Sequence, residues 1–107
     1  MDESRFDRLA DEALHRLEQA LDPLADGDDF DLENGGGILT LEFSDGAKFV
    51  VNSHRAARQI WVSALMHAAH CSYDEGGKRW VDSYSGKELH ALLGEALSTK
   101  LGRPVAL

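Results

Sequence analysis

The spacing of apolar residues changes twice along the chain, and this change constrains the fold class most. Between residues 6 and 24 the apolar side chains recur at steps of three and four, the period of a helix with one buried face. We expect this helix to run from about Ser4 to about Asp22. Ser4 is a suitable N-cap, Asp7 takes a capping-box position three residues later, and Pro23 should end the helix.

From about Asp28 the period becomes two, which predicts strands with one buried face. Phe30 and Leu32 would face one side of the first strand, and acidic residues the other. Turns rich in glycine, asparagine, aspartate and serine divide the region into about six strands, which we place at residues 28–33, 38–43, 47–52, 59–62, 71–74 and 78–82. The stretch from Ser63 to Ala69 could extend the fourth strand or form a short helical turn, and periodicity does not decide between them.

A second helical pattern closes the chain. Ser85 and Glu88 have capping-box spacing, and apolar residues follow at helical steps until Leu101. Gly102 is a suitable C-cap, and Pro104 lies just beyond it. The helix should therefore end near residue 100.

This order of elements predicts an α+β fold. Two helices with one apolar stripe each and a sheet with one apolar face pack as a two-layer αβ sandwich. Both helices would cover one face of an antiparallel sheet of five to six strands. A chain of 107 residues can form one hydrophobic core, so we expect a single domain over residues 1–107.

The charge is distributed unevenly. Residues 1–34 hold 12 acidic and 3 basic side chains, whereas residues 35–107 hold 7 acidic and 8 basic ones. Nucleic acids and anionic membranes would be repelled by such a segment, which favours cations or a basic protein surface as its partner. The chain has one cysteine, no signal-peptide pattern and no apolar run of about 20 residues, so we expect a soluble cytoplasmic protein.

The acidic residues follow the predicted elements. On the first helix Asp7, Asp11, His15, Glu18 and Asp22 are four, four, three and four residues apart and share the face opposite the apolar stripe. Alternate positions on the first strand, about 6.5 to 7 Å apart, and the connecting loop add further carboxylates. We name the whole set the acidic ridge: Asp7, Asp11, Glu18, Asp22, Asp26, Asp28, Asp29, Asp31 and Glu33.

Oxygen ligands without cysteine suit hard cations such as Fe²⁺, Fe³⁺, Mn²⁺ or Ca²⁺. Sites on solvated side chains should be open and weak. The ridge could equally be a solvated face that serves solubility, or a contact for a basic partner.

The other residues that could bind a metal or a partner give weaker indications of function. His67, His70 and Cys71 could bind a soft metal, but no second pair of ligands accompanies them and a structural role is favoured. Trp61 and Trp80 occupy strand positions that could share a sheet face. Each could be core, or an exposed anchor for a protein partner.

Four segments together resemble the frataxin family, and specifically its bacterial CyaY-type members. They cover nearly the whole chain and are residues 6–11, the acidic run 22–33 with the glycine turn and strand that follow it, Asn52 with 59–62, and residues 73–93 from Tyr73-Asp74 to Leu92-Leu93. Alanines at 56 and 57 replace a usual proline, Ser72 replaces a basic residue or histidine, and the stretch 63–72 is one residue longer than usual.

The resemblance implies the same αβ sandwich and a non-enzymatic iron-binding protein that regulates, or supplies iron to, iron–sulfur cluster assembly. Weakly bound iron would lie on Glu18, Asp22, Asp26, Asp28, Asp29, Asp31 and Glu33, with Asp7 and Asp11 as further ligands, and other hard cations could replace it. A cysteine desulfurase and an iron–sulfur scaffold protein are the implied partners, with Asn52, Gln59 and Trp61 as contact residues.

The protein would be mainly monomeric, with possible metal-driven oligomers. Two alternatives stay open: a ferroxidase that oxidises Fe²⁺ at the ridge, and a generic acidic protein-interaction domain.

Overall fold

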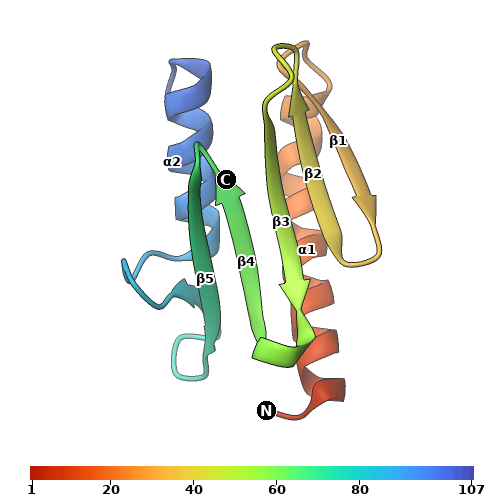
Figure 1. Cartoon of the computed structure of the whole chain (residues 1–107), viewed down its shortest axis with the longest axis vertical. Helices are drawn as coiled ribbons and strands as arrows, with labels where there is room; N and C mark the ends of the chain where they lie inside the picture. Colours follow the sequence, from red (N-terminus) through yellow and green to blue (C-terminus); the bar gives the residue numbers. More distant parts are fainter.

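The computed structural model describes residues 1–107 and forms two layers (Figure 1). One layer is a six-stranded antiparallel sheet in the order β1-β2-β3-β4-β5-β6, and the other consists of two helices on the same face of that sheet. The elements are α1 (Glu3–Ala25), β1 (Phe30–Gly35), β2 (Ile38–Phe43), β3 (Lys48–His54), the 3₁₀ turn η1 (Arg55–Ala57), β4 (Gln59–Ala64), β5 (His67–Asp74), β6 (Arg79–Asp82) and α2 (Leu89–Leu101). The predicted fold class is confirmed. Neither helix is both long and apolar enough to cross a membrane.

Both ends of α1 differ from the prediction. Asp2, not Ser4, is the N-cap: its backbone is extended and its carboxylate accepts a hydrogen bond of 2.8 Å from the Arg5 N–H. Pro23 does not end the helix, which continues to Ala25. Proline removes one backbone donor, but Leu21 is fully buried just before it and Leu24 packs on the core just after it. Packing therefore carries the last turn past the proline.

The β4–β5 hairpin settles the stretch that periodicity left open. Ala64 pairs with His67, so Leu65 and Met66 form a two-residue turn and the strands extend on both sides of it. Both turn residues are left-handed, with φ of 52° and 63°. This is the geometry of a type I′ turn, which asparagine and glycine usually occupy. The glycines at 36 and 37 make the corresponding turn between β1 and β2.

The start of α2 also differs in its cap. The helix begins at Leu89, and the carboxylate of Glu88 caps it by accepting a hydrogen bond of 3.0 Å from the His90 N–H. Ser85 instead belongs to the turn after β6, where its N–H donates to Asp82 at 2.8 Å. The predicted end is confirmed, because Gly102 is the left-handed C-cap with φ of 70°.

A single core of 20 residues fills the space between the layers. Trp80 belongs to it, 5% exposed, with its ring 5.8 Å from Phe6 and 5.3 Å from Tyr73. Trp61 lies on the opposite, outer face of the sheet, so the two tryptophans, which could have shared a face, do not. The two positions have opposite parity: Trp80 lies across from Tyr73 on β5, and Trp61 across from His70, three residues earlier.

Candidate functional site

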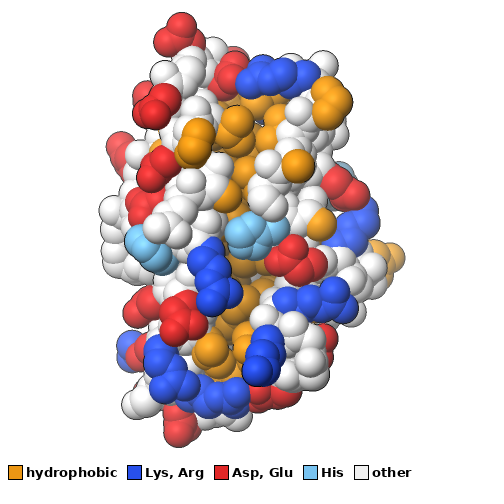
Figure 2. Space-filling view, turned by 180° about the vertical axis from the view of Figure 1, so that it is seen from behind, with side chains coloured by type: hydrophobic (Ala, Val, Ile, Leu, Met, Phe, Trp, Pro, Cys, Tyr) orange, Lys and Arg blue, Asp and Glu red, His pale blue; other side chains and the backbone are white.

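The helical part of the ridge lies along the flank of α1 that faces away from α2. Asp11 and Asp22 are exposed, whereas Asp7 and Glu18 are half-buried. Figure 2 shows the two helices from outside, with acidic side chains gathered on the left, the α1 side, and an apolar seam between the helices. The helical spacing therefore gives these carboxylates one common direction, as predicted.

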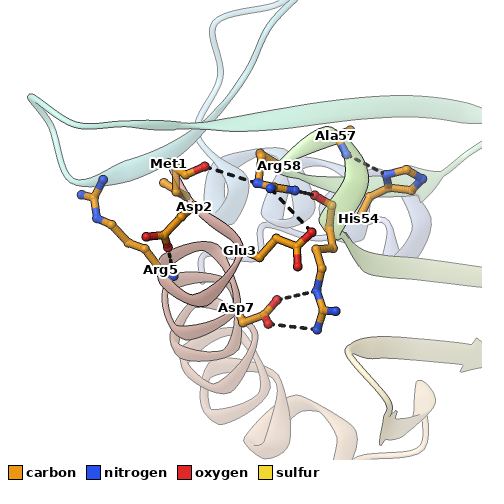
Figure 3. Close-up of polar contacts among 9 residues, drawn as sticks. Met1, Asp2, Glu3, Arg5, Asp7, His54, Ala57 and Arg58 are labelled. Atoms are coloured by element: carbon orange, nitrogen blue, oxygen red, sulfur yellow. Dashed lines mark hydrogen bonds and ion pairs between the residues drawn. The ribbon is translucent and has the colours of Figure 1, made fainter.

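Two ridge carboxylates are already paired with arginines from distant segments. Arg55 of η1 donates to both oxygens of Asp7, at 3.0 and 2.9 Å (Figure 3). Arg103, beyond α2, contacts Asp29 at 2.5 Å. Hydrogen bonding to these carboxylates raises the pKa of both guanidinium groups above its ordinary value. Asp7 and Asp29 thus connect the ridge to the rest of the fold.

The start of α1 is held to the sheet beside the first of these pairs. Arg58, which follows η1, lies 3.8 Å from the Glu3 carboxylate and donates to the Met1 carbonyl at 3.3 Å. Figure 3 shows Arg58 reaching toward the first turn of the helix, beside Glu3 and Met1. The contacts fix the direction in which α1 presents its acidic flank.

The strand part of the ridge lies on the outer face of the sheet. Asp31 and Glu33 are exposed on β1, alternating with the core-facing Phe30 and Leu32. Glu42 of β2, which the predicted ridge did not include, lies directly opposite Asp31 and joins the ridge. The alternation of residues 38–43, combined with a two-residue glycine turn after the first strand, would have predicted that Glu42 lies on the outer face opposite Asp31.

The ridge carboxylates do not converge on one point. No three histidine, cysteine, aspartate or glutamate side chains lie close enough to hold one metal ion together. Asp28, Asp31 and Glu42 surround a shallow polar hollow between the α1–β1 loop and the β2–β3 turn. The ridge therefore offers one or two carboxylates at each position and does not form a closed cage.

The second candidate site surrounds Trp61 on the outer sheet face. Asn52 lies directly opposite Trp61 on β3. The indole Nε1–H donates to the Gln59 side-chain oxygen at 2.9 Å, and the Gln59 amide donates to Ser72 at 3.2 Å. The structure therefore brings together the three residues named as partner contacts.

Two histidines complete this site. The rings of His54 and His70 stack on the indole of Trp61, with centroid distances of 3.9 and 4.6 Å. His54 could not be given a role from the sequence, because its neighbours depend on the β3–β4 register. The place of His70 depended on the stretch 63–69, which periodicity left open.

The structure rules out the soft-metal grouping of His67, His70 and Cys71. His70 points to the outer face, whereas Cys71 is fully buried in the core. Burial raises the pKa of the Cys71 thiol to about 12. A protonated, enclosed thiol is a structural residue.

Comparison with known proteins identifies the class of this fold and site. The family model for the frataxin-like domain matches residues 1–103. The iron-sulfur cluster assembly protein CyaY of Ralstonia nicotianae is 42% identical over 98 residues, which cover 90% of this chain and 85% of that protein. The chain belongs to the frataxin family, and the relative places it beside the bacterial CyaY-type members.

Solved structures agree with this assignment. A frataxin from Psychromonas ingrahamii superimposes with a TM-score of 0.85 at 29% identity, covering 99% of this chain and 97% of that one. A trimeric frataxin from Saccharomyces cerevisiae, complexed with ferrous iron, has a TM-score of 0.75 at 26% identity, covering 89% and 87%. The αβ sandwich is thus the frataxin architecture.

Proposed function

We propose that this protein binds iron on its acidic ridge and supplies it to, or regulates, iron–sulfur cluster assembly without being an enzyme itself. The Ralstonia relative is named as an assembly protein, and the yeast frataxin was solved with ferrous iron. The observation that carries the proposal is the charge at the end of α1. Its last turn has no basic residue, and Asp22 and the C-cap Asp26 both lie there.

A helix C-terminus carries about half a negative charge from its aligned peptide dipoles, so carboxylates there are unfavourable and cations are favourable. Asp28 in the loop and Asp31 on β1 continue the row of negative charge. Like charges at neighbouring helix positions cost about 0.2–0.5 kcal/mol a pair. A bound cation removes this repulsion, whereas a solvated surface that served only solubility would have no reason to concentrate charge at this helix end.

The ridge geometry supports weak, exchangeable binding. Positions with one or two carboxylates hold a hard cation loosely and leave it several water ligands. Such binding suits a protein that hands iron on, and it suits a contact with a basic surface of the cysteine desulfurase. The Trp61 face would then contact the iron–sulfur scaffold protein.

Titration with Fe²⁺ under anaerobic conditions, or with Co²⁺, followed by NMR tests the metal site. Paramagnetic broadening should be confined to the acidic ridge, from Asp7 to Glu33, and to Glu42. Broadening centred on His67, His70 or elsewhere would contradict the proposal. Oxygen consumption in the presence of Fe²⁺ tests the ferroxidase alternative, which requires the protein to accelerate it.

Two adjacent residues of α1 provide a matched pair of variants. Asp11 belongs to the ridge, whereas Glu12 faces the pocket between the helices. Asp11→Asn and Glu12→Gln remove the same charge one residue apart. Only the first should weaken cation binding; equal weakening would mean that net charge, and not the ridge, attracts the metal.

A further inference from the structure

The indole of Trp61 is enclosed between two imidazoles. His54 lies against it with the ring planes 13° apart, and His70 with the planes 25° apart. The two histidines belong to β3 and β5, the strands on either side of β4. They therefore approach the ring from opposite sides, and each face of the indole is covered.

Each histidine is held by contacts of its own. The Nδ1 atom of His54 accepts a hydrogen bond of 3.3 Å from the Ala57 N–H, which caps η1 (Figure 3). His70 is fixed through its backbone: its N–H donates to Asp82 at 3.0 Å, and its carbonyl accepts from Ser83. Hydrogen bonding holds Asp82 in place and, despite its burial, keeps its pKa below the usual value. The His54 ring is thus held by η1, and the His70 backbone is held by β6 and the turn after it, while pairing with β4 sets both residues beside Trp61.

The enclosure limits how another molecule can contact Trp61. A cation, or an aromatic ring that stacks, needs an open indole face, and both faces are occupied. The Nε1–H already donates to Gln59. The part of the ring left for a partner is its carbon edge, which suits an apolar notch.

Apart from the two histidines, the side chains around Trp61 on the outer face carry no formal charge. These outer-face positions are Val50 and Asn52 on β3, Gln59 and Ser63 on β4, and Ala68 and Ser72 on β5. The nearest charged side chains on this face form pairs farther out, Lys48 with Glu42 and Arg79 with Asp74. A matching surface would be apolar at its centre with uncharged amides or hydroxyls around it.

We propose that His54 and His70 are positioning residues that hold Trp61 upright, so that a protein partner takes the indole edge into an uncharged apolar notch. This inference rests on the proposed function, since it deepens the claim that the Trp61 face contacts the scaffold protein. It excludes an acidic peptide and a nucleic acid as the ligand of this face.

The first test measures the motion of the indole in the free protein. Heteronuclear ¹⁵N relaxation of the two indole N–H groups should show Trp61 as rigid as the buried Trp80 in the parent protein. In the double variant His54→Ala/His70→Ala only Trp61 should become mobile. Unchanged relaxation of the Trp61 indole in that variant would overturn the positioning role.

The second test measures binding of the scaffold protein. Loss of the two stacking contacts in the double alanine variant should weaken binding about 3- to 10-fold. His54→Phe/His70→Phe keeps a flat ring on each side and should bind like the parent, whereas His54→Asn keeps the acceptor for Ala57 without the ring and should bind more weakly. If the phenylalanine variant binds as weakly as the alanine variant, stacking is not what positions the indole.

Trp61→Ala separates the two proposals. If it leaves scaffold binding unchanged, the proposed function fails at this face. If it weakens binding but the double alanine variant does not, only the positioning role fails. The ratio of dissociation constants between Trp61→Ala and the parent should be the same at low and high salt. A ratio that collapses on adding salt would indicate an ionic contact and overturn the uncharged notch.

Discussion

Replacing Met66 with glycine should stabilise the protein. The residue is left-handed, with φ of 63°, and its side chain is fully exposed, so the substitution loses no burial. Left-handed backbone costs about 1–2 kcal/mol in a residue with a side chain. Glycine removes this cost but raises the entropy of the unfolded chain by about 0.4–1 kcal/mol. The net gain should be about 0.5–1 kcal/mol in the free energy of unfolding, or about 2–4 °C in Tm for a domain of this size.

Urea denaturation measures the gain as a higher midpoint with an unchanged slope. Met66→Ala is the matched control, since it removes the same side chain but keeps the Cβ atom and the strain. It should give no stabilisation. If both variants gain equally, exposure of the methionine and not backbone strain is responsible. If glycine gains nothing, the left-handed turn between β4 and β5 is not strained.

Three further predictions concern charge and protonation. Arg103→Ala frees the Asp29 carboxylate, so Co²⁺ titration should show tighter binding at the ridge; unchanged or weaker binding would place Asp29 outside the metal site. Hydrogen bonds keep the pKa of Asp82 low despite its burial, so its contribution to stability is present above about pH 4 and lost as the pH falls. Asp82→Asn should cost about 1–3 kcal/mol at pH 7 and flatten the acid limb of a stability profile, which a parallel urea series at each pH will show. Cys71 should react with a thiol reagent only as fast as the protein unfolds, because its pKa is about 12 and it is buried; fast labelling under native conditions would contradict this.

Periodicity predicted the fold because buried apolar side chains recur at different steps in the two kinds of element: three or four residues in a helix and two in a strand. The apolar stripes of α1 and α2 and the alternation in β2 appear in the sequence with little interruption. Element ends were predicted less well. Ser4 and Asp2 are both good caps, and only the backbone of the folded chain selects Asp2. Pro23 ends an isolated helix but not one whose last turn is held by core packing.

The direction of the ridge carboxylates could be predicted from spacing, but their partners could not. Arg55 lies 48 residues from Asp7, and Arg103 lies 74 residues from Asp29. No local pattern connects such pairs. The same limit applies to Trp61: which residues flank it depends on the register of β4 against both neighbouring strands, and a shift of one residue would exchange His70 for the buried Cys71.

The two arginine pairs also change what the ridge can do. Pairing at Asp7 compensates the N-terminal end of the α1 flank, and pairing at Asp29 ties the loop to the segment beyond α2. The ridge charge without a paired base on α1 therefore lies between them, from Asp11 through Glu18 and Asp22 to the end of the helix. The helix dipole adds to it there, whereas at the other end of α1 the dipole would oppose it. The carboxylates at the C-terminal end of α1 are the least favourable ones, and no basic side chain pairs with them. A cation added at that end of α1 should therefore stabilise the fold most.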